Sequence, residues 1–330
     1  MFLHVNDLTV DFTTEDGVVH AVDELSFEVE RGSTLGVVGE SGSGKSVTSL
    51  AVLGLHDPRT STISGSVLFE GQELLGAPRT AMERLRGDRI AMIFQDPLTS
   101  LSPYHTVGAQ IAEVYRRHRG TSRSAAWERA IQMLDRVGIP QPKARAEDYP
   151  HQFSGGMRQR ATIAMALVCD PGLLIADEPT TALDVTVQAQ ILDLLRELQE
   201  QSGTAIILIT HDLGVVATAA HDVLVMYAGR AVERGTVREV LREPRHPYTW
   251  GLLGSMPTLR RPVTEELRPV RGAPPSLLNV PKGCPFHPRC DFVELPGPRV
   301  CTGERPELSP PRGHGDACYL TMKQKREVAP

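Results

Sequence analysis

A glycine-rich loop near the start of the chain has the residue types and spacing needed to bind phosphate. Four residues separate Gly39 from Gly44-Lys45-Ser46. Glycines let the backbone curl around phosphate oxygens, and Lys45 adds positive charge beside them. Ser46 offers its hydroxyl to Mg²⁺. The predicted nucleotide-binding residues here are Gly39, Glu40, Ser41, Gly42, Ser43, Gly44, Lys45, Ser46 and Val47.

The sequence on either side of this loop supports the same interpretation. An apolar, strand-like run over 34–38 precedes the loop, and a helical stretch over 47–55 follows it. A phosphate-binding loop requires this strand, loop and helix order. The context therefore favours a nucleotide site over a flexible Gly/Ser-rich segment.

An acidic pair ends a second apolar run. Residues 173–176 are apolar, and Asp177 and Glu178 follow them directly. In an open α/β sheet, groups at the carboxyl end of a strand lie where ligands bind. We expect Asp177 to hold Mg²⁺ through its hydration shell and Glu178 to orient or deprotonate the attacking water.

Two more apolar strands end in polar side chains. The strand over 90–94 leads to Gln95, whose amide can contact metal-bound water, and the strand over 205–210 leads to His211. Either residue alone is more often an ordinary loop residue. Their order along the chain, with the loop and the acidic pair, makes both candidates for catalysis and Gln95 a candidate Mg²⁺ contact.

A Ser-Gly-Gly run lies between the loop and the acidic pair. Ser154, Gly155 and Gly156 come before Met157, and Ser154 stands 23 positions (177 − 154) before Asp177. A serine and two glycine amides at the start of a helix would form an anion site. This run therefore indicates a second group that contacts nucleotide.

In this order the elements resemble the nucleotide-binding subunits of ATP-binding-cassette transporters, over roughly residues 1–255. The resemblance matches residues 39–46 to the Walker A loop, Gln95 to the Q-loop, 154–157 to the signature, Asp177-Glu178 to the Walker B pair, Ala182-Leu183-Asp184 to the D-loop, and His211 to the switch histidine. It implies an α/β P-loop NTPase fold with a RecA-like core, an antiparallel β subdomain and a helical subdomain over about 98–165. It also implies a head-to-tail dimer in which one subunit's signature closes over ATP held by the other.

Two positions depart from the pattern of that family. The signature usually reads Leu-Ser-Gly-Gly-Gln, whereas Phe153 and Met157 replace its outer residues here, and a glutamine follows at Gln159. Methionine cannot donate the hydrogen bonds of a glutamine amide. Phe12 is the best candidate to stack on adenine, and a role in the core is equally compatible with its position.

Composition limits the other functional classes. The 330 residues include 35 basic and 40 acidic side chains, a formal net charge of −5, so no general basic field favours nucleic acid. Arg116, Arg117 and Arg119 are expected on a solvated helix face. No apolar run approaches the ~20 residues that span a bilayer, and the first residues do not resemble a signal peptide. We expect a peripheral protein at the cytoplasmic face of the inner membrane.

The last segment, over about 256–330, has a different composition. Prolines interrupt it, which favours turns over packed helices, and it holds Cys284, Cys290, Cys301 and Cys318. Thiols in the cytosol stay reduced, so these four are read as metal ligands rather than disulfides. An iron–sulfur cluster, zinc and unbound thiols all fit the spacing, and His287, inside the Cys284–Cys290 loop, is a candidate substitute ligand. Cys169 lies outside this group and is expected in the core.

The same segment resembles the C-terminal extension of oligopeptide and dipeptide permease ATPases. The resemblance rests on Arg245-His246-Pro247-Tyr248-Thr249 and on the Cys284–Cys290 run. It implies an ATP-hydrolysing subunit for import of di- and oligopeptides, with a [4Fe–4S] cluster or zinc in the tail. Its partners would be a second ATPase, related or identical, two permeases and an extracytoplasmic peptide-binding protein. Import of nickel, glutathione or another small solute is the nearest alternative. An ATPase acting on nucleic acid is an alternative of another class, but it would normally need a second cassette or a coil insertion, and this sequence shows neither.

Overall fold

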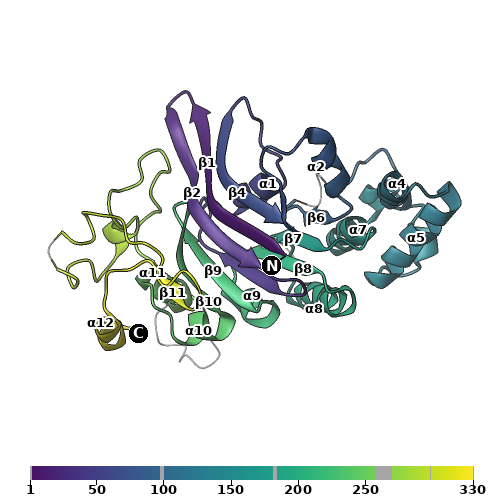
Figure 1. The fold of residues 1–330 in the computed structure, drawn as a ribbon. Coiled ribbons are helices and arrows are strands. Elements are labelled where there is room, and N and C mark those ends of the chain that lie inside the picture. The colour runs from purple at the N-terminus through teal and green to yellow at the C-terminus, as the bar shows by residue number, and fades with distance from the viewer. Residues whose placement is uncertain (1, 97–99, 181–183, 257–269, 298, 330) are drawn as a thin grey trace. The chain divides into compact units, whose positions relative to one another are not determined.

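The computed structural model describes residues 2–96, 100–180, 184–256, 270–297 and 299–329 (Figure 1). The chain folds into two compact units. Unit 1 comprises Met1–Phe2, Val29–Thr34 and Gly76–Ile209, and unit 2 comprises Leu3–Glu28, Leu35–Leu75 and Thr210–Pro330. Each unit therefore gathers segments that are far apart in the sequence.

Parallel strands form the centre of unit 1. β6 (Ile90–Ile93) pairs with β7 (Leu173–Asp177), and β7 pairs with β8 (Ala205–Thr210). Every residue of β7 and β8 is buried, as expected for parallel strands covered on both faces. Because parallel strands end at the same edge, the residues that follow β6 and β7 are brought together.

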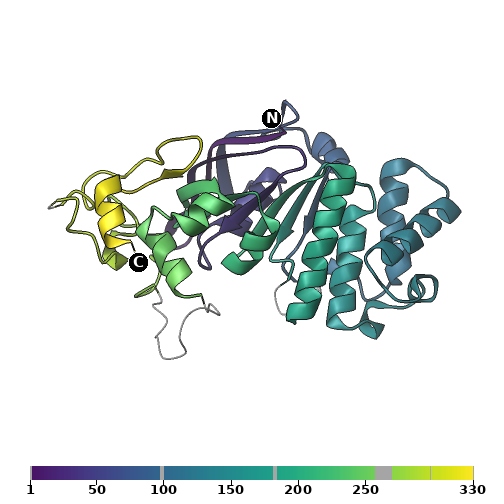
Figure 2. The same ribbon diagram turned by 90° about the horizontal axis from the view of Figure 1, so that it is seen from below.

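Helices make up most of the rest of unit 1. They are α2 (Arg79–Leu85), α4 (Val107–Arg119), α5 (Arg123–Arg136), α6 (Pro142–Arg145), η1 (Pro150–Gln152), α7 (Gly155–Leu167) and α8 (Val185–Ser202). α4, α5 and α7 pack against one another, and Figures 1 and 2 show α4 and α5 side by side. The predicted helix over 124–137 is confirmed as α5.

Arg117 and Arg119 of α4 are exposed as predicted, whereas Arg116 is partly buried, and Arg116 and Arg119 also make specific bonds. Arg116 pairs with Glu113 at 2.6 Å. Arg119 pairs with Asp88 at 3.0 Å and donates to the carbonyl of Cys169 at 2.6 Å. Cys169 is itself fully buried, so its predicted place in the core is confirmed. Arg119 thus ties α4 to the neighbouring segments that contain Asp88 and Cys169.

Unit 2 contains an antiparallel sheet in the order β2-β1-β4-β5. Its strands are β1 (Leu3–Thr14), β2 (Gly17–Val29), β4 (Ser61–Phe69) and β5 (Gln72–Glu73). Buried and partly exposed residues alternate along much of β1, which is typical of a strand with one face on a core. This sheet carries Phe12.

The phosphate-loop strand belongs to a second group of strands in unit 2. β3 (Thr34–Val38) pairs in parallel with β9 (Asp222–Tyr227), and β9 pairs antiparallel with β10 (Arg230–Thr236). The helices of the unit are α1 (Lys45–Val52), α9 (Leu213–Ala219), α10 (Val237–Arg242), α11 (Pro247–Gly254) and α12 (Met322–Val328). No described helix in either unit is long and apolar enough to cross a membrane.

The tail is rich in turns, as its prolines predict. It contains the short helix η2 (His287–Arg289), the strand β11 (Gly315–Asp316) and α12, with loops between them (Figures 1 and 2). β11 adds to β10 in antiparallel register, with Glu233 opposite Asp316. Cys284, Phe286 and Cys301 pack in the same hydrophobic cluster as β9. The tail therefore shares the core of unit 2.

Candidate functional site

The phosphate loop of unit 2 requires glycine at two positions. A Cβ on Gly39 would lie 2.3 Å from the carbonyl oxygen of Met226, and one on Gly44 would lie 2.4 Å from that of Ala21. Gly44 also has φ 98°, which L side chains rarely adopt. The loop thus passes too close to neighbouring backbone for any larger residue.

Lys45 is held over this loop by oxygen atoms. Its ammonium donates to the carbonyls of Gly39 at 2.7 Å and Glu40 at 2.9 Å, and to the hydroxyl of Ser43 at 3.3 Å. Lys45 also begins α1, so the first N–H groups of that helix adjoin the loop. Ser46 is exposed. These groups can bind phosphate through backbone amides and one positive charge.

Unit 2 also carries Phe12 and His211. Phe12 is partly buried in β1, and its ring meets that of His56 edge to face with centroids 5.2 Å apart. Its stacking on adenine stays a prediction. His211 follows β8 and is exposed, and the next residue, Asp212, caps α9 by accepting from Gly214 N at 2.7 Å.

In unit 1 the structure brings Gln95 and Glu178 together. The Gln95 amide donates to Glu178 Oε2 at 3.0 Å. Glu178 has φ 48°, in the left-handed region, and its N–H donates to the carbonyl of Ile209 at 2.9 Å. Strained backbone of this kind persists where surrounding bonds hold it and is typical of active sites. Asp177 lies beside it, buried at the end of β7.

The Ser-Gly-Gly run begins α7, as predicted. Ser154 is the N-cap, and its hydroxyl accepts from Met157 N at 3.3 Å. Apart from its chain neighbours and the backbone of its own helix, no described heavy atom lies within 4 Å of a Cβ built on Gly155, so the helix is open at this residue. Gln159 is buried and donates to the carbonyl of Pro179 at 2.7 Å. Gln159 therefore ties α7 to the turn after Glu178 and cannot replace the signature glutamine.

Only part of the predicted D-loop is described. Ala182 and Leu183 lie outside the described residues. Asp184 caps α8, because its carboxylate accepts from Val187 N at 2.9 Å. It is exposed, as a contact to nucleotide or a partner would require.

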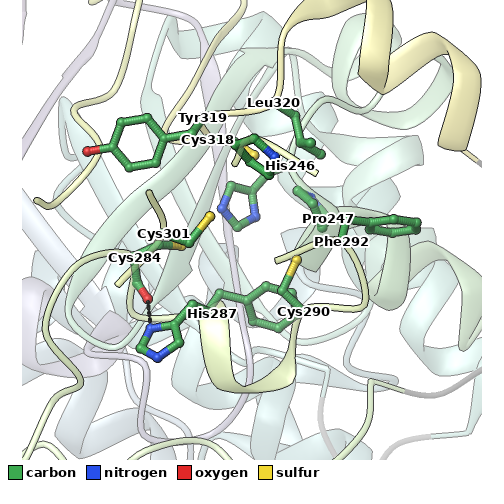
Figure 3. Close-up of a pocket in the computed structure, with 12 residues that line it drawn as sticks. His246, Pro247, Cys284, His287, Cys290, Phe292, Cys301, Cys318, Tyr319 and Leu320 are labelled. Carbon is green, nitrogen blue, oxygen red and sulfur yellow. Dashed lines mark hydrogen bonds between the residues drawn. The ribbon is translucent and has the colours of Figure 1, made fainter. Parts of the chain in front are cut away.

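The four tail cysteines line one small cavity (Figure 3). Its walls include Cys284, Cys290, Cys301, Cys318, His246 and His287. Burial raises the pKa of the Cys284 and Cys318 thiols to about 12. Among the residues that the structure describes, no three His, Cys, Asp or Glu side chains are arranged around one metal ion.

The two histidines of the cavity differ in the nitrogen that they present. His246 Nδ1 accepts from Tyr248 N at 3.1 Å, so in the neutral ring Nε2 carries the proton. Burial lowers the pKa of His246 to about 4, which keeps the ring neutral. Its Nε2 has no hydrogen-bond partner among the described residues, although the Ala317 backbone lies near the ring. His287 Nδ1 contacts the Cys284 carbonyl at 2.9 Å, so its Nε2 presents a lone pair.

The sequence alone assigned no partner to Glu40. Its carboxylate forms a paired contact with Arg289 of the tail, and its N–H donates to Tyr248 Oη at 2.8 Å. Arg289 and Tyr248 both stand in the motifs that carry the resemblance to permease ATPases. Their place in these motifs was the sequence signal that both residues matter, but no spacing rule predicts a contact between residue 40 and residue 289.

Comparisons with known proteins agree with this geometry. The family described as ABC transporter matches residues 22–181, and the family described as Oligopeptide/dipeptide transporter, C-terminal region, matches residues 232–295. The oligopeptide transport ATP-binding protein OppD of Salmonella typhimurium is 51% identical over 324 residues, which cover 98% of this chain and 95% of the relative. OppD of Bacillus subtilis is 54% identical over 292 residues, covering 88% of this chain and 82% of the relative.

Solved structures resemble the cassette part of the chain. The ATP-binding cassette MJ0796, in a dimeric post-hydrolysis state bound to ADP and Pi, has a TM-score of 0.65 at 25% identity, covering 72% of this chain and 99% of that one. The transporter component cbiO1 of Clostridium perfringens has a TM-score of 0.62 at 30% identity, covering 73% and 91%. The fold is thus the P-loop ABC ATPase fold with a cysteine-rich C-terminal extension. The chain belongs to the ATP-binding proteins of ABC transporters, in the group that carries the oligopeptide/dipeptide transporter C-terminal region.

Proposed function

We propose that this chain is the ATPase subunit that energises import of di- and oligopeptides. The observation that carries the proposal is the similarity to oligopeptide transport ATP-binding proteins over 98% of the chain, tail included. The cassette would occupy about 1–255 and the extension 256–330. The chain would act at the cytoplasmic face of the inner membrane, paired with a second, related ATPase, on two permeases supplied by an extracytoplasmic peptide-binding protein.

Within this function, the residues of each unit have distinct roles. The phosphate loop binds ATP, with Lys45 on the β and γ phosphates and Ser46 on Mg²⁺. Glu178 orients or deprotonates the water, and Gln95, Asp177 and His211 complete the group around the γ phosphate and its metal. The bond between Gln95 and Glu178 supports this assignment, because it aims both polar side chains at one place.

The signature acts in trans in this proposal. Ser154 and the amides of Gly155 and Gly156 contact ATP that is bound by the partner ATPase, and Asp184 faces the same partner. The exposure of Ser154 and Gly155 at the start of α7, with open space beside Gly155, supports this role. The dimeric state of the related cassette bound to ADP and Pi also supports it. ATP binding then closes the pair, and phosphate release opens it.

Peptide import is tested by uptake into vesicles that contain the chain with its second ATPase, permeases and binding protein. We expect ATP-dependent accumulation of a labelled tripeptide, and competition by other short peptides. Labelled nickel and labelled glutathione, offered to the same vesicles, are expected to stay outside. ATP-driven uptake of either of these without peptide uptake would overturn the substrate assignment but leave the ATPase assignment standing.

We also propose that the cysteine cavity holds a [4Fe–4S] cluster bound by Cys284, Cys290, Cys301 and Cys318. Each thiolate of such a cluster binds a different iron atom, so the four sulfurs need not converge on one point. Thiols that line one cavity without surrounding a single ion fit this cluster better than zinc. The group would supply a metal–sulfur core that crosslinks the loops of the tail.

His246 of the cavity fits the same donor set. The protonated Nε2 of His246 can donate to a sulfur atom but cannot bind a metal. His246 is therefore proposed as a hydrogen-bond donor to the sulfur core.

Loading of this site should depend on pH and on the cavity cysteines alone. Because the thiol pKa values of Cys284 and Cys318 are about 12, metal binding must release protons, and loading of the cluster should improve as pH rises from 6 to about 8.

Cys318→Ala should abolish bound iron and the brown colour of anaerobically prepared protein. Cys169→Ala, which removes a buried thiol outside the cavity, should retain both. A colourless preparation with stoichiometric zinc would overturn the cluster assignment.

A further inference from the structure

Arg289 of the tail is closely bonded to its surroundings. Its guanidinium has five N–H groups, and each makes a hydrogen bond. The acceptors are the two carboxylate oxygens of Glu40 at 2.6 and 2.9 Å, the carbonyls of Arg271 at 2.7 Å and Gly272 at 3.1 Å, and Tyr227 Oη at 3.3 Å. The Arg289 side chain is only 6% exposed. Its orientation is thus fixed by bonds on every side.

Glu40 receives contacts on all three of its polar groups. Its carboxylate binds Arg289, and its N–H donates to Tyr248 Oη at 2.8 Å. Its carbonyl accepts from the Lys45 ammonium at 2.9 Å. Two of these three contacts come from the C-terminal part of the chain, and the third leads to the lysine of the phosphate loop. Glu40 therefore joins the tail to the nucleotide site.

Aromatic packing surrounds Tyr248 and the tail segment that carries Arg289. The ring of Tyr248 lies 4.7 Å from that of Tyr227 and 5.4 Å from that of Phe286, measured between centroids. Phe286 and Arg289 belong to the same short segment as Cys284 and Cys290. The segment that lines the cysteine cavity is thus the segment that holds Glu40.

We propose that Arg289 and Tyr248 are positioning residues for ATP binding, which hold the phosphate loop in its binding conformation through Glu40. The proposal rests on ATP binding at that loop. Two physical effects act in the same direction. The bonds to Glu40 fix the carbonyl that orients Lys45, which lowers the cost of ordering the loop around phosphate. The charge of Arg289 also neutralises a carboxylate that would otherwise repel the triphosphate.

The test is the affinity of the full chain for ATP with Mg²⁺, together with KM and kcat of the assembled complex. Arg289→Gln should weaken ATP binding and raise KM about tenfold, while kcat at saturating ATP changes less than about twofold. Tyr248→Phe removes one oxygen atom and should weaken binding about threefold. Arg312→Gln, which removes an exposed arginine elsewhere in the tail, should leave both constants unchanged.

A double variant separates the charge effect of Arg289 from general damage to the fold. Glu40→Gln added to Arg289→Gln removes the unpaired carboxylate, so ATP should bind more tightly to the double variant than to Arg289→Gln alone, with the part of the affinity that came from the bonds to Glu40 still lost. Loss of affinity that is equal or greater in the double variant would overturn the proposal, as would ATP affinities unchanged by both Arg289→Gln and Tyr248→Phe. The Lys45→Ala variant tests whether ATP binds at the phosphate loop at all. If this variant bound ATP as tightly as the unmodified chain, the loop would not be the nucleotide site.

Discussion

Replacement of Glu178 by glutamine is expected to lower steady-state ATP turnover of the assembled transporter by about 10²- to 10⁴-fold, the contribution typical of a general base. The change removes one negative charge and keeps the shape of the side chain. A glutamine oxygen at the same place can still accept the bond that Gln95 gives to Glu178 Oε2. The loss should therefore appear in the chemical step, with ATP affinity retained and the ATP-bound, closed complex accumulating.

The matched control for this change is Glu200→Gln. Glu200 lies exposed on α8 and undergoes the same loss of charge away from the proposed site. Its turnover should equal that of the unmodified chain. If Glu178→Gln left turnover undiminished, Glu178 would not be the catalytic base, and the bond with Gln95 would have only a structural role.

The parts of this site that could be predicted are those encoded over short distances. The phosphate loop depends on glycines within six positions, and the structure shows why Gly39 and Gly44 meet backbone too closely to be replaced. The meeting of Gln95 and Glu178 follows from the rule that parallel strands end at one edge of a sheet. The strands β6 and β7 could be recognised from their apolar runs, so the amino-acid sequence was enough to apply that rule.

The parts that could not be predicted depend on long-range packing. Glu40 and Arg289 stand 249 positions apart, and no local pattern in the sequence links the two charges. The burial of Gln159 against the carbonyl of Pro179 likewise depends on how α7 meets the turn after β7. The helix α12 was missed because it is short and polar. It is held by a capping box at Thr321 and by a buried ion pair between Lys325 and Asp316. Hydrophobic periodicity reports neither kind of contact.

The signature serine offers a test in which stability and function can be separated within one chain. Ser154 and Ser122 are both exposed N-caps, and their hydroxyls accept from Met157 N at 3.3 Å and Ala125 N at 3.2 Å. Alanine at either position should cost about 1 kcal/mol of stability, because each change removes the same capping bond. Thermal unfolding of the two variants should therefore be closely similar.

Their effects on turnover should differ widely. In the proposed arrangement the Ser154 hydroxyl contacts ATP on the partner subunit, and loss of one such donor costs about 10²-fold in rate. Ser154→Ala should therefore lower turnover of the complex to that extent, whereas Ser122→Ala should not. ATP affinity of the isolated chain should be unchanged in both, because its own site is the loop that contains Lys45. Equal turnover in the two variants would contradict action in trans and leave Ser154 as a helix cap alone.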